Sequence, residues 1–373
     1  RGRGLSVTFG ARALIRLGAL KQNLEVIRGA APGAKVMAVI KANAYGHGMV
    51  EVAHSLDGAD SFAVARLPEA VQLHESGIDK PIVLLAGVLT SSELVEATLR
   101  NFELVVHCAE QIELLEGAPR GNLTVWLKFD TGMNRLGFST DEADTMIERL
   151  QSCRAVGELR LMSHLASADE LDNPMTEEQF SRFREVVGGF EGAVSIANTP
   201  ATLGWSQVAD AAGSFGFEGS HWIRPGLALF GISPFAGRTG TDLHLTPVMQ
   251  FEARLISKKP LREGARVGYK GKYRSQADTT IGIISAGYGD GYSRHFRTGT
   301  PVLLNGRRIP LIGNVSMDMI AVDLGDAAED TVGDIATLWG DGLPAEEVAP
   351  WADAIPYELV CGVMHRETSK VVD

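Results

Sequence analysis

A lysine with unusual flanks is the residue of this chain best suited to covalent chemistry. Lys41 follows the apolar residues Ala38-Val39-Ile40 and precedes the segment Ala42-Asn-Ala-Tyr-Gly-His-Gly48. A lone lysine after an apolar strand is usually a solvated strand end. A strand covered by helices, however, would leave the ammonium partly desolvated, which lowers its pKa and makes the amine a usable nucleophile. The segment therefore predicts an amine that can form a Schiff base.

Further polar residues stand where other strands are expected to end. They are the run from Lys128 to Arg135, His164, the pair Asn198-Thr199, and the segment Arg224-Pro-Gly226. In a barrel of parallel strands these ends meet on one face. Several cations, an imidazole, hydroxyl groups and a glycine that allows close backbone approach would then surround one small ligand. This set suits a ligand with both a phosphate and a carboxylate group.

The elements that must position these residues alternate along the first two thirds of the chain. Short apolar runs predict eight strands, over residues 35–40, 61–65, 81–86, 103–107, 124–129, 159–165, 194–197 and 222–229. Amphipathic segments predict helices over 17–27, 48–56, 68–76, 91–99, 110–115, 141–150 and 176–187. Eight such units predict a (β/α)8 barrel. An open doubly wound sheet is the alternative, but the segment after the first strand lacks its G-x-G-x-x-G turn.

The pattern changes after about Arg238. Strand-like runs then follow one another without long helices, over residues 248–256, 279–285, 301–304, 308–312, 319–324 and 335–339. Asn305-Gly306 between two of them is typical of a two-residue hairpin, because both central positions of a type I′ turn need positive φ. We therefore expect a barrel domain over residues 11–238 and a mostly antiparallel β domain over 239–373, which also takes in residues 1–10.

Composition excludes several classes of protein. The 373 residues carry a net charge of −11 and no basic patch, which argues against a nucleic-acid partner. No apolar run approaches the roughly 20 residues of a membrane span, and the first residues lack the apolar core of a signal peptide. Three scattered cysteines, Cys108, Cys153 and Cys361, argue against a disulfide framework or a zinc site. They indicate a reducing cytoplasm.

Six segments, in order and over nearly the whole chain, resemble the alanine racemase family. They are the lysine motif at 38–48, Lys128 to Gly137 (KFDTGMNRLG), His164 to Glu170 (HLASADE), Arg224-Pro-Gly226, Val267-Gly-Tyr269 and Ser316-Met-Asp318. The resemblance implies a barrel followed by a β domain. It implies pyridoxal 5′-phosphate as cofactor and a head-to-tail homodimer whose subunits complete each other's active sites. It also implies interconversion of L- and D-alanine, for peptidoglycan synthesis or for alanine catabolism.

The resemblance also assigns the proton-transfer groups. Lys41 is similar to the lysine that binds the cofactor and carries one proton, and Tyr269 to the opposing base from the partner subunit. Racemisation removes the α-proton from one face and returns it on the other, so two bases on opposite faces are the simplest solution. A free tyrosine is a poor base at neutral pH. His164 resembles the residue that hydrogen-bonds this tyrosine and links it to Arg224, the expected partner of the pyridine nitrogen.

Binding roles follow from the same resemblance. The cofactor phosphate is expected to contact Tyr45, Asn198, Thr199, Gly226, Leu227 and Tyr357, with Asn198 the weaker candidate. Arg135 and the backbone N–H of Met317 match positions that bind the substrate carboxylate. Lys128 aligns with a lysine that is carbamylated in some members, and Tyr288 and Asp318 with residues at the substrate entrance. No metal site is expected.

One departure and three alternatives remain. Relatives commonly carry Arg-x-Pro-Arg near the C-terminus, where this chain has His365 to Lys370. A pyridoxal-dependent decarboxylase would need a glycine-rich phosphate loop, an acidic partner for the ring nitrogen and a catalytic cysteine near the C-terminus. A racemase of broader specificity is usually periplasmic with a disulfide. A non-catalytic cofactor carrier would lack the β domain with Tyr269 and Met317.

Overall fold

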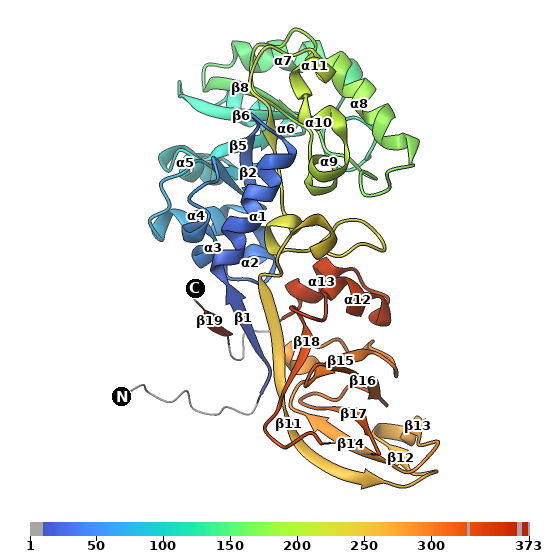
Figure 1. The fold of residues 1–373 in the computed structure, drawn as a ribbon. Coiled ribbons are helices and arrows are strands. Elements are labelled where there is room, and N and C mark those ends of the chain that lie inside the picture. Colours follow the sequence, from blue (N-terminus) through green and yellow to red (C-terminus); the bar gives the residue numbers. More distant parts are fainter. Residues whose placement is uncertain (1–9, 327–328, 364–367, 372–373) are drawn as a thin grey trace. The chain divides into compact units, whose positions relative to one another are not determined.

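The computed structural model describes residues 10–326, 329–363 and 368–371 (Figure 1). The chain forms two compact units, one of residues 20–229 and 233–238 and the other of residues 1–19, 230–232 and 239–373. The second unit, called the β unit below, includes residues up to 19, whereas the expected barrel domain began at residue 11. The reason is that β1 (Arg12–Arg16) pairs with strands of the β unit on both of its edges. Residues 1–9 and 365–367, on which expectations also fall, lie outside the described residues.

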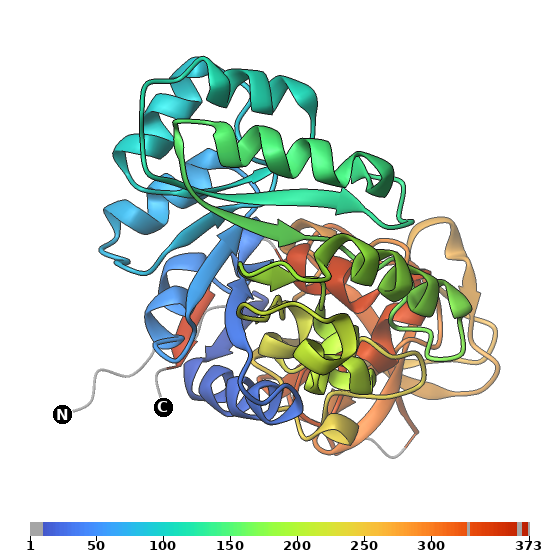
Figure 2. The same cartoon turned by 90° about the horizontal axis from the view of Figure 1, so that it is seen from above.

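The first unit is a barrel of parallel strands. Eight of its described strands run in the order β10-β2-β3-β4-β5-β6-β8-β9, and the short strand β7 (Phe138–Ser139) pairs with β6 off this path. The strands of the path are β2 (Lys35–Val39), β3 (Ser61–Val64), β4 (Ile82–Leu84), β5 (Glu103–Val106), β6 (Leu123–Asp130), β8 (Val156–Met162), β9 (Val194–Ser195) and β10 (Trp222–Ile223). Parallel bridges Val194–His221 and Asn198–Arg224 bring the two ends of this path together. The predicted (β/α)8 barrel is confirmed, and Figure 2 shows it from above.

Helices follow the strands at the predicted places. The longer ones are α1 (Leu17–Ala30), α3 (Met49–Ser55), α4 (Leu67–Glu75), α5 (Ser91–Leu99), α6 (Ala109–Glu116), α7 (Ala143–Ser152) and α8 (Pro174–Val187), and short helices α9 (Thr199–Gly204), α10 (Ser206–Ala209) and α11 (Ala211–Phe215) come before β10. Each of the longer helices buries apolar residues from the face that its spacing predicts, whereas α9, α10 and α11 were not predicted. In α8 this face includes Phe180, Phe183 and Val187, all without exposed surface.

The second unit is built on the long strand β11 (Met249–Leu261). The sheet order is β14-β17-β16-β15-β18-β11-β1-β19. The remaining strands are β14 (Thr279–Ile284), β15 (Pro301–Leu304), β16 (Arg307–Ile312), β17 (Ile320–Gly325), β18 (Ile335–Trp339) and β19 (Thr368–Val371), with β12 (Arg266–Val267) and β13 (Tyr273–Arg274) as a separate pair. Every described pairing in the larger sheet is antiparallel except that of β1 with β19. The predicted antiparallel domain is confirmed.

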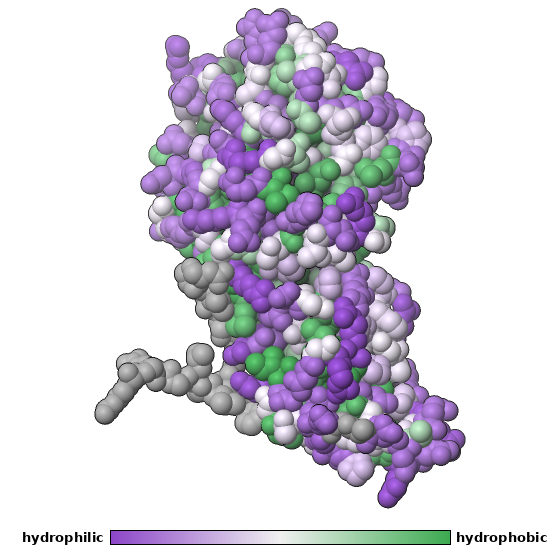
Figure 3. Space-filling view, in the orientation of Figure 1, coloured by the Kyte–Doolittle hydropathy of each residue, from purple (hydrophilic) through white to green (hydrophobic). Residues whose placement is uncertain are grey.

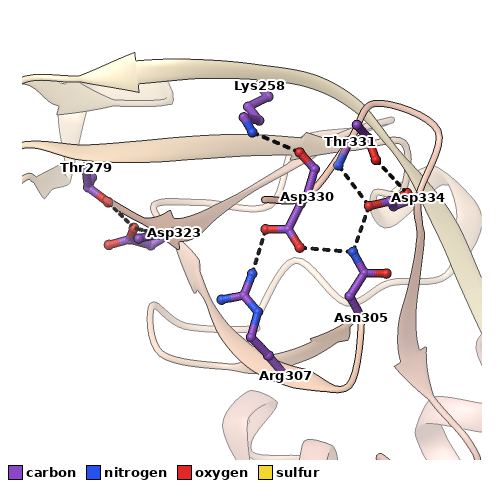
Figure 4. A network of polar contacts seen from close by, with 9 residues as sticks. Lys258, Thr279, Asn305, Arg307, Asp323, Asp330, Thr331 and Asp334 are labelled. Atoms are coloured by element: carbon purple, nitrogen blue, oxygen red, sulfur yellow. Dashed lines mark hydrogen bonds and ion pairs between the residues drawn. The ribbon is translucent and has the colours of Figure 1, made fainter. Parts of the chain in front are cut away.

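A polar network fixes the predicted hairpin between β15 and β16 (Figure 4). Asn305 and Gly306 have φ of 48° and 76°, as a type I′ turn requires. The buried carboxylate of Asp330 accepts from Arg307 at 2.6 Å and from the Asn305 amide at 3.1 Å. The same Asn305 amide donates to Asp334 at 2.7 Å. The hairpin is therefore tied to the segment that precedes β18.

The surface of the protein is mostly hydrophilic on the face that Figure 3 shows. Among the described residues, no helix is long and apolar enough to cross a membrane, and no group of acidic, histidine and cysteine side chains could hold a metal ion. Cys108, Cys153 and Cys361 form no disulfide.

Candidate active site

Lys41 opens a left-handed turn, α2 (Lys41–Tyr45), rather than simply ending a strand. The backbone N–H of Ile40 donates to Ala63 in β3 at 3.0 Å, and the four residues after Lys41 then have φ of 53–54°. For residues with a Cβ atom this conformation costs roughly 1–2 kcal/mol each. Such a run persists only where its surroundings fix it, and strain of this kind is concentrated at functional sites.

Three side chains fix this turn. The Glu69 carboxylate accepts from the Ala42 N–H at 2.7 Å, and the Asn43 side-chain oxygen accepts from the Met49 N–H at 2.9 Å. Nδ1 of His47 donates to the carbonyl oxygens of Ala44 and Tyr45 at 3.0 and 2.9 Å. Because carbonyl groups only accept, Nδ1 carries the proton. Burial lowers the pKa of His47 to about 4, so the ring is neutral.

Tyr45 and Thr199 bring two hydroxyl groups to the backbone at Gly226. A Cβ atom placed on Gly226 would lie 2.5 Å from the Tyr45 hydroxyl oxygen, so only glycine allows this approach. The Gly226 N–H donates to the Thr199 hydroxyl at 2.9 Å. Asn198 caps α9, accepting from the Ala201 N–H at 3.2 Å, and Leu227 is buried next to Gly226. Hydroxyls and backbone amides around a glycine are the groups that commonly bind phosphate.

Arg224 lies buried among the strand ends. Its guanidinium donates to the Ser195 hydroxyl, to the Ser163 carbonyl at 2.6 Å and to the Ile196 carbonyl at 3.3 Å. It also lies 3.2 Å from Nδ1 of His164. Burial lowers the pKa of Arg224 to about 9, which still leaves it protonated at neutral pH. The guanidinium is therefore a fixed hydrogen-bond donor within the barrel.

His164 and Lys128 show how closely cations gather here. Burial lowers the pKa of His164 well below its usual value, and the charges of Arg224, Lys128, Arg135 and Lys41 lower it further. Lys128 is buried, and its pKa falls to about 8 through burial and the charges of Arg224 and Arg135, with Asp130 opposing. A region with several cations and few carboxylates favours anionic ligands.

The loop after β6 presents Arg135 at the surface. The Asp130 carboxylate accepts from the backbone N–H groups of Gly132 at 2.8 Å, Asn134 at 3.0 Å and Arg135 at 3.0 Å. One side chain thus organises the whole turn. Asp130 was not singled out from the sequence, although an aspartate at the start of a D-x-G-x-N turn is a usable signal.

Gln179 in α8 joins this loop to the one after β8. Its amide N–H₂ group donates to the Thr131 hydroxyl at 3.1 Å and to the His164 carbonyl at 3.0 Å, and its oxygen accepts from the Ala166 N–H at 2.9 Å. The side chain is fully buried. Gln179 was not predicted from the sequence, because a glutamine within a helical pattern usually belongs to the polar face.

The expected partner-subunit residues lie at the surface of the β unit. Tyr269 is 69% exposed and Met317 50% exposed. Tyr288 lies beside Met317, since its N–H donates to Ser316 at 3.0 Å and the Gly289 N–H donates to Met317 at 2.9 Å. Asp318 is exposed, and Tyr357 lies half-buried in α13 (Pro356–Cys361).

Comparison with known proteins identifies the family. The chain matches the N-terminal domain of alanine racemase over residues 15–234 and the C-terminal domain over residues 248–371. It belongs to the alanine racemase family. The alanine racemases of Aliivibrio salmonicida and Vibrio atlanticus are each 45% identical to it. Their matches cover 95% and 97% of this chain and 97% and 99% of those relatives.

Solved alanine racemase structures share the fold. The biosynthetic alanine racemase of Pseudomonas aeruginosa is 39% identical, with a TM-score of 0.91 over 98% of this chain and 100% of that one. The alanine racemase of Acinetobacter baumannii is 33% identical, with a TM-score of 0.87 over 98% and 100%. These alanine racemase relatives do not favour the alternative of a broader-specificity racemase.

Proposed function

We propose that this protein interconverts L- and D-alanine, with pyridoxal 5′-phosphate bound covalently by Lys41. The observation that carries the proposal is the buried Arg224 at the strand ends, 3.2 Å from Nδ1 of His164, with the buried Lys128 in the adjacent strand β6. The charges of Lys128, Arg135 and Lys41 also lower the pKa of His164. Family membership sets the reaction class. When bound, pyridoxal phosphate supplies the electron sink that acidifies the α-proton of an amino acid.

The residues of the barrel fit this cofactor. The hydroxyls of Tyr45 and Thr199 beside Gly226, with the amides of Gly226 and Leu227, would hold the phosphate, and Asn198 would orient the Thr199 end. Tyr357 of the β unit would add a third hydroxyl. Arg224 would face the pyridine nitrogen. Since Arg224 stays protonated, it would leave that nitrogen unprotonated, weaken the electron sink and suppress side reactions such as transamination.

Two bases on opposite faces would move the proton. The Lys41 amine takes or returns it on one face, and Tyr269 of a second copy does so on the other. The exposure of Tyr269 and Met317 on the β unit supports a head-to-tail homodimer. His164, whose Nδ1 accepts from Arg224, is left with its proton on Nε2, where it would donate to the tyrosine oxygen and stabilise its deprotonated form.

Substrate binding would use the remaining cations. Arg135 and the backbone N–H of Met317 from the second copy would bind the alanine carboxylate, with Tyr288 and Asp318 at the entrance. Carbamylated Lys128 would supply a negative charge that orients Arg135. We place the protein in the cytoplasm, consistent with its scattered cysteines, which form no disulfide. Its D-alanine would serve peptidoglycan synthesis, or the enzyme would serve alanine catabolism.

The purified protein tests the proposal directly. Visible absorbance that shifts after borohydride, together with interconversion of D- and L-alanine, is the expected result. Absence of a reducible chromophore would contradict it. Tyr269→Phe should abolish racemisation and keep the chromophore, whereas a non-catalytic carrier would be inactive before and after the change. In Arg224→Glu, an unchanged racemase rate without new transamination would count against the role given to Arg224.

A further inference from the structure

Glu69 connects a helix cap to the backbone next to Lys41. It stands in the first turn of α4, where its Oε2 accepts from the N–H groups of Ala65 at 2.8 Å and Arg66 at 3.1 Å. Its Oε1 accepts from the Ala42 N–H at 2.7 Å. One carboxylate therefore binds both the start of α4 and the peptide group that follows Lys41.

Lys41 is consequently anchored on both sides by the same βα unit. The N–H of Ile40 donates to Ala63 in β3, and the N–H of Ala42 donates to Glu69 in the helix that follows β3. Between these bonds and Gly46, the chain adopts a left-handed conformation for which alanine and tyrosine have no intrinsic preference. Without the Glu69 oxygen, we expect Ala42 to relax toward an ordinary conformation and to displace Lys41 and Tyr45.

We infer that Glu69 is a positioning residue for Lys41, acting through the Ala42 amide; the inference rests on the proposed role of Lys41 as the cofactor lysine. Glu69 itself is not expected to touch substrate or cofactor, because both of its carboxylate oxygens bind backbone N–H groups. Its effect is to set the direction in which the side chains of Lys41 and Tyr45 point from the turn.

The next βα unit provides a matched control. Glu93 occupies the corresponding place in α5, and its Oε2 accepts from the N–H groups of Leu89 at 2.9 Å and Thr90 at 3.2 Å. The described hydrogen bonds of its side chain stay within residues 89–93. Glu69 and Glu93 thus share the capping contacts, and only Glu69 reaches the Lys41 turn.

The test compares Glu69→Gln with Glu93→Gln in the full chain. Glutamine keeps one accepting oxygen, so it cannot accept at both the helix cap and Ala42. Glu93→Gln keeps an oxygen for both cap bonds of α5 and should lose little thermal stability, whereas Glu69→Gln should lose some because it gives up one of its contacts. Only Glu69→Gln should lower kcat, by about tenfold or more, because small displacements of reacting groups are costly. Only this variant should weaken the visible circular dichroism of the bound cofactor and its affinity for pyridoxal phosphate.

Hydrogen exchange of cofactor-free protein separates this inference from the proposed function. The Ala42 N–H should exchange at least about tenfold faster in Glu69→Gln and at the wild-type rate in Glu93→Gln. An unchanged Ala42 exchange rate, or kcat and visible dichroism equal to those of Glu93→Gln, would overturn the inference. Wild-type protein without racemase activity would contradict only the proposed function. If Glu69→Gln does not fold, Glu69→Asp, whose side chain is too short to span both contacts, takes its place with the same expected results.

Discussion

Nη2 of Arg224 lies 3.2 Å from Nδ1 of His164. A protonated guanidinium has no acceptor, so Nδ1 must be the unprotonated nitrogen of the ring. The proton of the neutral imidazole is then on Nε2. The contact thereby fixes both the charge and the tautomer of His164. The sequence alone determines neither.

The first prediction concerns this tautomer. His164 should remain neutral with its proton on Nε2 as the pH falls from 7 through 6.5, since burial and four nearby cations lower its pKa. Nitrogen NMR of the imidazole rings measures this. In Arg224→Leu, the pKa of His164 should rise toward its ordinary value. Because the unfolded state takes up the proton near pH 6.5 and the folded state does not, His164 should make the protein less stable as the pH falls below that value. Protonation of His164 near pH 6.5 in the wild type would contradict the assignment.

The second prediction concerns Lys128. An amine with a pKa of about 8 is neutral in about a tenth of molecules at pH 7, against about one in a few thousand for an ordinary lysine. A neutral amine reacts with carbon dioxide, so Lys128 should form a carbamate, increasingly as the pH rises from 7 to 8. Carbon NMR with labelled bicarbonate should show one carbamate signal that Lys128→Arg lacks. The same signal in the variant would assign the modification elsewhere.

The third prediction concerns Gln179. Replacement by methionine keeps the volume but removes three hydrogen bonds to the loops that carry Arg135 and His164. We expect kcat/KM to fall by about tenfold or more. Gln111 is the control, because it bridges the loops after β4 and β5 in the same way, accepting from His107 at 2.8 Å and donating to Ala86 at 3.0 Å. Gln111→Met should cost similar stability and leave kcat/KM within about twofold. Equal kinetic losses would show that Gln179 acts only through stability.

The fourth prediction concerns two neighbouring arginines in β16. Arg307 pairs with Asp330, which is 2% exposed, whereas Arg308 pairs with Glu347 at the surface. Asp330→Ala should lower the free energy of unfolding by about 2–3 kcal/mol, because it removes charged hydrogen bonds from the hairpin. Glu347→Ala should lower it by less than about 1 kcal/mol. Denaturant unfolding measures both, and equal losses would contradict the special role of Asp330.

The regular elements were predictable because their signals are local. The buried strands at 35–39 and 103–106 read as apolar runs, and Asn305-Gly306 specified its own turn. The left-handed turn after Lys41 was not predictable, because Ala42 and Ala44 carry no preference for it. It depends on Glu69, which is distant in sequence and reads locally as a helix cap. The role of Gln179 was not predictable for the same reason, since its partners lie in the loops after β6 and β8.

Strand β1 has a consequence for synthesis of the chain. It is made before the whole barrel, yet it pairs with β11, where Glu252 lies 240 positions after Arg12, and with β19. On the ribosome, the barrel can therefore fold while β1 still lacks both neighbours. The β sheet completes only when β19 has emerged, so a nascent chain that still lacks β19 would leave one edge of β1 unpaired. Emergence of β19 from the ribosome, rather than folding of the barrel, therefore sets the earliest time at which this sheet can close.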